Sequence, residues 1–248
     1  MDLYHRLLEI YGPRGWWPLP SRAGRDGRDE RGYLPGGGPP SDRAGIFEIS
    51  VGAVLTQGIS WTNAERALLR LLENDFLDPR RIADCPPETL ASLVRPAGYY
   101  NVKARKLIEL SGFFLGLRPD GPGFRAPGRT DLLRVWGIGP ETADCILTYA
   151  FGIPSFVIDE YTRRIFGRTG LADPKEPYEK LRTAVERGIP DSPAVYAEYH
   201  ALIVEHGKLR CRTRPDCRPC PLLSCCEYGL SSLSYETART KHDTSSLV

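Results

Sequence analysis

The stretch that decides the fold is LLRVWGIGPETADCILTYAFGIPSFVIDEYTRRIFGR, residues 132–168. Its first helical run breaks at Gly137-Ile138-Gly139 and restarts at Pro140, which suits a first helical position because no N–H is needed there. The pattern therefore predicts two helices joined by a glycine hairpin. The bare N–H groups of Gly137 and Gly139 at a helix start are able to bind an anion, and a DNA phosphate is the natural candidate. A plain αα-hairpin with a glycine turn is the alternative that GIG alone leaves open.

A carboxylate follows this hairpin downstream. The apolar run Phe156–Ile158 ends in Asp159, after which the chain becomes polar and basic. Together, GIGPETADCILTYA and FVIDEYTRRI resemble the helix-hairpin-helix/Gly-Pro-Asp DNA glycosylases, the endonuclease III superfamily. The resemblance implies that Gly137 and Gly139 hold the DNA backbone beside a lesion and that Asp159 is the catalytic carboxylate. From its position alone, Asp159 is also a good N-cap for the helix that follows, and both roles can hold together.

Helical periodicity dominates the rest of the chain, since few segments alternate with the period of two that strands require. The sequence therefore predicts an all-α fold. On the family resemblance, residues 44–165 form a six-helix lobe with the helix-hairpin-helix, and residues 1–43 join 166–228 in a second lobe, with a DNA cleft between the two. Residues 20–43, dominated by Gly, Pro, Arg and Asp, are predicted as a surface loop, and residues 229–248 as a tail.

The charge balance gives no global sign of a polyanionic partner. The 248-residue chain has 33 Lys and Arg against 31 Asp and Glu, a net charge of +2. Basic clusters are local, and each is weak evidence of DNA contact when taken singly. No apolar run reaches the ~20 residues of a membrane span, and MDLYHRLLEI is no signal peptide. We therefore expect a cytoplasmic, nucleoid-associated monomer whose partner is double-stranded DNA containing a damaged base.

Cysteines gather near the C-terminus in the segment CRTRPDCRPCPLLSCC. In a cytosolic chain such a cluster indicates a metal more often than disulfides. Four thiolates suit zinc, and the unequal gaps suit a single iron–sulfur cubane, so the spacing leaves both open. The resemblance favours a [4Fe–4S] cluster, although the first gap has five residues where the family commonly has six, and Cys225 is an alternative to its neighbour. The implied ligands are Cys211, Cys217, Cys220 and Cys226.

The hairpin carries a glutamate, Glu141, where many members of the superfamily have a lysine. That lysine forms a Schiff base with the sugar and gives those members strand-cleaving lyase activity. Because a carboxylate cannot form an imine, the sequence predicts a monofunctional glycosylase that uses water. A glutamate here most resembles the 3-methyladenine DNA glycosylase III-type branch, which excises alkylated purines and whose best-known members need not carry an intact Fe–S set. The adenine-removing branch has a glutamate where this chain has Gly52, so that branch is disfavoured.

Three tryptophans are candidates for the base pocket, because the enzyme must flip the nucleotide out of the stack. The resemblance places Trp16, Trp17 and Trp61 near the pocket mouth, and aromatic faces attract a cationic alkylated base. Ordinary buried aromatics are the alternative. Glu141 is a further pocket candidate, or else a first-turn acid that complements the helix dipole.

Three more residues are predicted DNA contacts. Gln57 matches the place where relatives fill the gap left by the flipped base, Tyr99 matches a wedge on the opposite strand, and Arg163 follows Asp159 in a basic cluster; each is otherwise a loop or surface residue. The sequence thus favours a monofunctional DNA N-glycosylase of base excision repair with a preference for an alkylated purine. A glycosylase for oxidised or deaminated pyrimidines is the alternative enzyme, and a non-catalytic helix-hairpin-helix DNA-binding protein is the alternative of another class.

Overall fold

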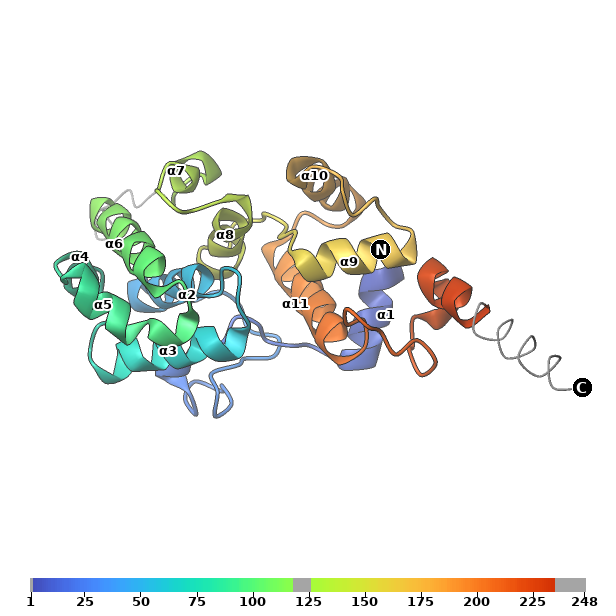
Figure 1. Ribbon diagram of the computed structural model, residues 1–248, viewed down its shortest axis with the longest axis horizontal. Coiled ribbons are helices and arrows are strands. Elements are labelled where there is room, and N and C mark those ends of the chain that lie inside the picture. Colours follow the sequence, from blue (N-terminus) through green and yellow to red (C-terminus); the bar gives the residue numbers. More distant parts are fainter. Residues whose placement is uncertain (1, 118–125, 235–248) are drawn as a thin grey trace, which may run out of the picture. The chain divides into compact units, whose positions relative to one another are not determined.

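The computed structural model describes residues 2–117 and 126–234, and all regular secondary structure in these ranges is helical (Figure 1). The prediction of an all-α fold is confirmed. The chain divides into two compact units. Unit 1 consists of Met1–Pro13, Ile158–Pro190 and Glu198–Val248, and unit 2 consists of Arg14–Val157 and Asp191–Ala197.

Unit 2 is built around α2 (Arg43–Leu55), which is buried without interruption from Phe47 to its end. An apolar sequence on every side of a helix is the pattern of a helix enclosed by others. The carboxylate of Asp42 caps its start by accepting from the N–H of Gly45 at 3.0 Å. The other helical segments of unit 2 are η1 (Pro20–Arg22), α3 (Trp61–Glu73), α4 (Pro79–Ala83), α5 (Pro87–Leu93), η2 (Arg95–Ala97), α6 (Tyr100–Gly116), α7 (Arg129–Leu133), α8 (Pro140–Cys145) and the π-helical turn η3 (Ile146–Ala150).

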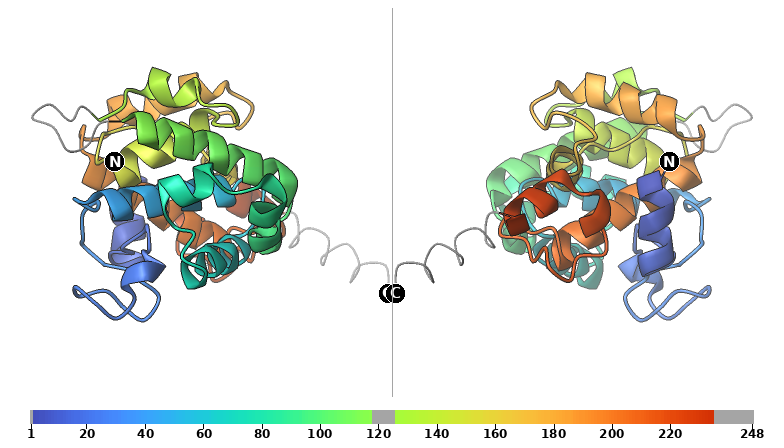
Figure 2. Two further views of the ribbon diagram at one scale, coloured as in Figure 1. Left: turned by 90° about the vertical axis from the view of Figure 1, so that its left-hand side faces the viewer. Right: turned by 90° about the vertical axis from the view of Figure 1, so that its right-hand side faces the viewer.

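Unit 1 joins the N-terminal helix to the C-terminal part of the chain. Figures 1 and 2 show α1 beside α11, and the ring centroids of Tyr4 and Tyr199 lie 5.4 Å apart. The hydroxyl of Tyr11 lies 2.8 Å from Nδ1 of His206. The helical segments of this unit are α1 (Asp2–Tyr11), α9 (Glu160–Thr169), α10 (Tyr178–Gly188), η4 (Leu223–Cys225) and α11 (Pro193–Leu209), whose first residues belong to unit 2.

The glycine-rich segment 14–43 packs within unit 2, although the family resemblance grouped it with the C-terminal lobe. The physical reason is that Trp17 and Leu19 are buried in the core of unit 2. The backbone N–H and the hydroxyl of Ser21 also donate to the buried carboxyl of Glu48 on α2. Although this segment has few apolar residues, the burial of Trp17 and Leu19 and the hydrogen bonds from Ser21 to Glu48 attach it to unit 2.

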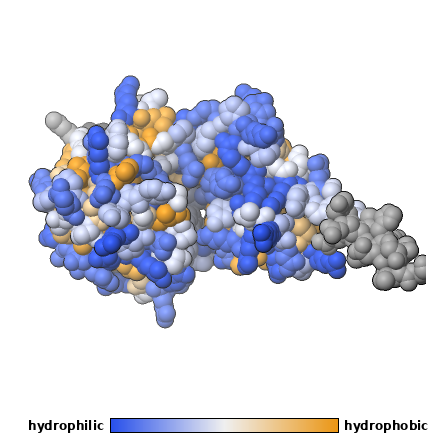
Figure 3. Space-filling model, in the orientation of Figure 1, coloured by the Kyte–Doolittle hydropathy of each residue, from blue (hydrophilic) through white to orange (hydrophobic). Residues whose placement is uncertain are grey.

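The boundary between the units falls between Val157 and Ile158, so Asp159 is the second residue of a segment of unit 1. Within the predicted tail of residues 229–248, residues 235–248 lie outside the described part of the chain. On the face drawn in Figure 3, hydrophilic residues predominate and apolar ones form small patches. In the two described ranges, no helix combines the length and the apolar character that a membrane crossing requires.

Candidate active site

Asp159 caps the N-terminus of α9. Its backbone is extended, and its Oδ1 accepts from the N–H of Thr162 at 2.7 Å and from the Thr162 hydroxyl at 2.9 Å. The capping role that the sequence allowed is therefore real, and it engages one carboxylate oxygen. The other oxygen, Oδ2, lies 3.4 Å from Nε2 of His200 on α11.

The Asp159 carboxylate is held in its ionised form. Burial raises its pKa, but the hydrogen bond and charge of His200 and the two bonds from Thr162 outweigh that effect, so the pKa lies below the ordinary value. The side chains of Asp159 and His200 are 15% and 6% exposed, so the pair is largely shielded from solvent. Sequence reasoning missed His200; the available signal was a histidine in the otherwise apolar run HALIV of α11.

The hairpin glycines differ in what surrounds them. Gly137 has φ +85, and a Cβ placed on it would lie 2.4 Å from Cγ of Lys106, so the lysine stem lies against this turn. Gly139 is the N-cap of α8 with φ −93, and no atom lies within 4 Å of the position of its missing Cβ. Gly137 thus serves the turn itself, whereas Gly139 leaves open space in front of the backbone.

Gln57 is bonded to the hairpin. Its Nε2 donates to the carbonyl of Gly137 at 3.1 Å and to the hydroxyl of Thr142 at 2.8 Å. Its Oε1 accepts from Nζ of Lys106 at 2.6 Å, and burial lowers the pKa of that lysine. These bonds connect α6, the segment after α2 and the hairpin within unit 2, so Gln57 fixes the hairpin position in this conformation.

The three predicted pocket tryptophans form one cluster. The centroid of the Trp16 ring lies 5.1 Å from that of Trp17 and 5.0 Å from that of Trp61, and the Trp17 and Trp61 rings meet edge to face at 5.4 Å. Trp17 and Trp61 are each only 7% exposed. A Cβ on Gly52 would lie 2.9 Å from Nε1 of Trp17, so the indole occupies the space that a side chain on this face of α2 would need. Glu141, in contrast, is exposed on the first turn of α8.

Tyr99 and Arg163 are in very different surroundings. Tyr99 is 76% exposed and has a left-handed backbone (φ +43) before α6. Arg163 donates through Nη1 to the carbonyls of Pro174 and Glu176, at 2.9 and 2.7 Å, and so holds the α9–α10 connection. Tyr99, the predicted wedge, is therefore accessible from solvent, while Arg163 has a structural function whether or not it meets DNA.

The four predicted metal ligands line one cavity of unit 1 together with His206. Burial raises the pKa of the Cys217 and Cys220 thiols, and the other thiols of the cavity raise it further. Cys225 is exposed, does not line the cavity, and its thiol faces the carbonyl of Leu222. The four-cysteine set that the resemblance implied is thus brought together, and Cys225 stands apart from it.

The donor set fits a thiolate-ligated cubane. Nη1 of Arg168 donates to Sγ of Cys211 at 3.2 Å, and the N–H of Gly229 donates to Sγ of Cys226 at 3.4 Å; hydrogen bonds of this kind stabilise cluster sulfurs. Within the described ranges, no three His, Cys, Asp or Glu side chains converge as ligands of a single metal ion would.

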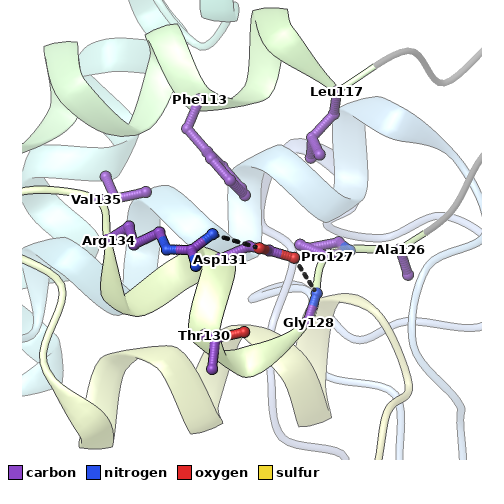
Figure 4. Close-up of a pocket in the computed structure, with 9 residues that line it drawn as sticks. All are labelled: Phe113, Leu117, Ala126, Pro127, Gly128, Thr130, Asp131, Arg134 and Val135. Carbon is purple, nitrogen blue, oxygen red and sulfur yellow. Dashed lines mark hydrogen bonds and ion pairs between the residues drawn. The ribbon is translucent and has the colours of Figure 1, made fainter.

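A separate hollow of unit 2 lies between α6 and α7 (Figure 4). Its one carboxylate, Asp131, accepts from the N–H of Gly128 at 2.9 Å and pairs with Arg134 at 3.5 Å. None of the predicted site residues lines this hollow, and its polar groups serve the start of α7.

Residues 51–191 match the family model of the HhH-GPD superfamily base excision DNA repair proteins. The chain belongs to the HhH-GPD superfamily. It is accordingly a DNA glycosylase of base excision repair. A candidate DNA repair glycosylase of Methanocaldococcus jannaschii is 36% identical over 230 residues, which cover 90% of this chain and 94% of that protein.

Two solved structures place the chain within the HhH-GPD fold. A non-covalent endonuclease III–DNA complex superimposes with a TM-score of 0.71 over 94% of this chain and 96% of that one, at 20% identity, and so shares the fold. The 3-methyladenine DNA glycosylase of H. pylori, bound to 1,N6-ethenoadenine, is 33% identical with a TM-score of 0.57, over 65% of this chain and 84% of that one. The predicted membership of the endonuclease III superfamily is confirmed.

Proposed function

We propose that this protein is a monofunctional DNA glycosylase that hydrolyses the N-glycosidic bond of an alkylated purine in double-stranded DNA. The observation that carries the proposal is an ionised, capped carboxylate, Asp159, in a chain whose hairpin has Glu141 in place of the lysine nucleophile. The Asp159 carboxylate supplies a negative charge that can stabilise the sugar cation, and residue 141 of the hairpin supplies no amine that could form a Schiff base.

The reaction begins when the damaged nucleotide leaves the stack. As the bond to the base breaks, the sugar acquires oxocarbenium character, and a nearby carboxylate stabilises that positive charge. Asp159 is suited to this because its lowered pKa keeps it charged at neutral pH. Its second task is to accept a proton from the attacking water, which leaves an abasic site and no covalent adduct.

Preference for an alkylated purine is assigned to the partly exposed ring of Trp16, against which the buried rings of Trp17 and Trp61 pack, because aromatic rings favour a cationic base. The H. pylori relative, a 3-methyladenine DNA glycosylase bound to a modified adenine, supports this reading. We assign the exposed Glu141 to the base pocket as well, because its charge favours a cationic lesion.

DNA contacts are assigned to the hairpin and three other residues. The amides of Gly137 and Gly139 hold a phosphate, Tyr99 is the wedge, and Gln57 enters the gap after its bonds to the hairpin open. Arg163 contacts the backbone through the guanidinium nitrogens that do not hold the α9–α10 connection.

The cavity of unit 1 is proposed to hold a [4Fe–4S] cluster through Cys211, Cys217, Cys220 and Cys226. When bound, the cluster supplies a structural cross-link between the segments that carry its ligands. Iron content tests this assignment with a matched pair: Cys226→Ser is expected to lose the cluster, whereas Cys225→Ser keeps it. Equal iron loss in both variants, or zinc in place of iron in the wild-type protein, contradicts the assignment.

The function is tested with a panel of duplexes that each hold one modified base, alkylated purines and oxidised or deaminated pyrimidines included, scored for abasic sites. Wild-type protein is expected to release an alkylated purine, and Asp159→Asn is expected to lose at least about 100-fold in rate, the usual contribution of a positioned acid–base group. Release of a pyrimidine instead supports the endonuclease III-like alternative. No release from any duplex supports the non-catalytic alternative.

Borohydride trapping tests the monofunctional assignment. Wild-type protein is expected to form no adduct with abasic duplex, because Glu141 cannot form an imine. The variant Glu141→Lys restores an amine at this position and serves as the control that trapping works in this scaffold. Efficient trapping of the wild-type protein overturns the assignment.

A further inference from the structure

His200 is a buried polar group that the proposed reaction has not yet used. It lies on α11, in the apolar run that forms part of the core of unit 1, and its ring is directed at Asp159. Nε2 lies 3.4 Å from Oδ2, so a hydrogen bond between them requires the proton on Nε2. Burying a histidine in an apolar helix is costly unless its ring has a partner, and here the partner is the carboxylate.

The acceptor positions of the carboxylate can be counted. Each oxygen of an ionised carboxylate accepts about two hydrogen bonds. Oδ1 of Asp159 already receives two donors, both from Thr162. Oδ2 faces Nε2 of His200 at 3.4 Å, so a donation from His200 would leave Oδ2 one position for a sugar or a water. Such a donation would determine which lone pair of Asp159 is left for the reaction.

The other titratable neighbours do not supply this contact. Burial and the charge of Asp159 raise the pKa of Tyr161 on α9, whose ring is covered by the guanidinium of Arg164. The hydroxyl of Tyr178 on α10 accepts from the N–H of Ile158 at 3.3 Å. Both groups lie at the start of α9, whereas the side chain that faces Oδ2, at 3.4 Å, is His200 on α11.

We propose that His200 is a positioning residue of this glycosylase, which donates to Oδ2 and keeps the Asp159 carboxylate charged and oriented for the reaction. The inference rests on the proposed function of Asp159 and adds a second residue to it. Without His200, burial of the carboxylate is opposed by Thr162 alone, so the protonated form of Asp159 becomes more accessible as the pH falls.

The test compares His200→Gln with His200→Asn and His200→Ala in the full-length protein. An amide on the longer glutamine stem replaces the Nε2 donor, whereas asparagine is too short and alanine has none. For the latter two variants we expect kcat for base release to fall about 10- to 100-fold, the effect of losing one hydrogen bond to a charged group. The acidic limb of their pH–rate profile is expected to move to higher pH, and His200→Gln is expected to restore most of both properties.

Val204→Ala is the matched control, because Val204 is also buried and lies one turn further along α11. The substitution removes packing but no group that could donate to Asp159, so its pH profile is expected to match the wild type. Wild-type kinetics in His200→Ala overturn the inference, as does a loss of activity with an unmoved acidic limb and no rescue by glutamine. If His200→Ala does not fold, the glutamine and asparagine variants decide. If wild-type protein releases no base, the proposed function fails, and the outcome is distinct from these.

Discussion

Replacing each hairpin glycine by alanine separates the needs of the fold from those of DNA binding. At Gly137 the backbone has φ +85, which costs an alanine about 1–2 kcal/mol. The added methyl would also stand 2.4 Å from Cγ of Lys106 and displace it from Gln57. A hydrogen bond to a charged group contributes about 1.5–3 kcal/mol, part of which water restores at this half-buried amine. We expect Gly137→Ala to destabilise the protein by about 2–4 kcal/mol in total.

At Gly139 the same substitution has a different meaning. The backbone has φ −93, and the new methyl would meet no atom within 4 Å. The change is expected to cost at most about 1 kcal/mol, the scale of an N-cap preference. The methyl does occupy the space through which a phosphate reaches the amides of the hairpin, so binding to duplex DNA is expected to weaken at least about tenfold, or about 1.4 kcal/mol.

The two variants are compared by thermal denaturation and by fluorescence anisotropy with a labelled duplex that holds an abasic-site analogue. Gly137→Ala is expected to lower the melting temperature by about 5–15 °C, and Gly139→Ala to lower it little. A melting temperature for Gly137→Ala equal to that of the wild type refutes the argument from positive φ. Wild-type affinity in Gly139→Ala refutes the claim that DNA approaches the backbone at this residue.

Three further outcomes are expected. Arg129→Ala removes the guanidinium that pairs at 2.7 Å with the fully buried carboxylate of Asp144, so unfolding free energy should fall by about 3–5 kcal/mol in denaturant titrations; a change below ~1 kcal/mol contradicts this. Burial raises the pKa of Glu48, so the folded state binds more protons than the unfolded state. The free energy of unfolding therefore falls as the pH rises from the unfolded-state pKa of Glu48 through its folded-state pKa. Glu48→Gln should remove this pH dependence of stability, and an unchanged pH dependence would contradict the assignment. Arg105 lies 4.0 Å over the half-exposed ring of Trp136 beside the hairpin; if it contacts a phosphate, Arg105→Ala should reduce the slope of log affinity against log salt by about 1, and an unchanged slope excludes the contact.

Local signals predicted the features that depend on neighbouring residues. The glycines of GIG mark a turn that includes positive φ at Gly137, and Asp159 before a helical run marks an N-cap. Both follow from backbone sterics and from the unpaired N–H groups of a helix start, which act within a few residues. The cysteine spacing predicted a common site for the same reason, because three of the four thiols lie within ten residues of one another.

Contacts between distant segments were beyond these signals. Gln57 bonds the hairpin 80 residues away, and His200 reaches a carboxylate on another helix. Helical periodicity states which face of a helix is buried, but not which helix covers it. A polar residue on a buried face therefore indicates that it has a partner, but the sequence does not say which residue that is. The partners of Gln57 and His200 were identified only in the structure.

The placement of Trp17 shows why one of these distant contacts also limits the chemistry. Trp17 precedes the predicted surface loop of residues 20–43, and it takes the buried alternative that the sequence left open for it. Its ring is 7% exposed, and its Nε1 lies where a Cβ of residue 52 would project. Any side chain on this face of α2 would displace the indole, so the observed position of Trp17 requires a glycine at residue 52. An acidic side chain at position 52 would therefore require the tryptophan cluster to rearrange. The absence of a carboxylate at Gly52 is thus a property of the packed unit, and a substitution there is expected to disrupt the cluster before it could add an acid to the reaction.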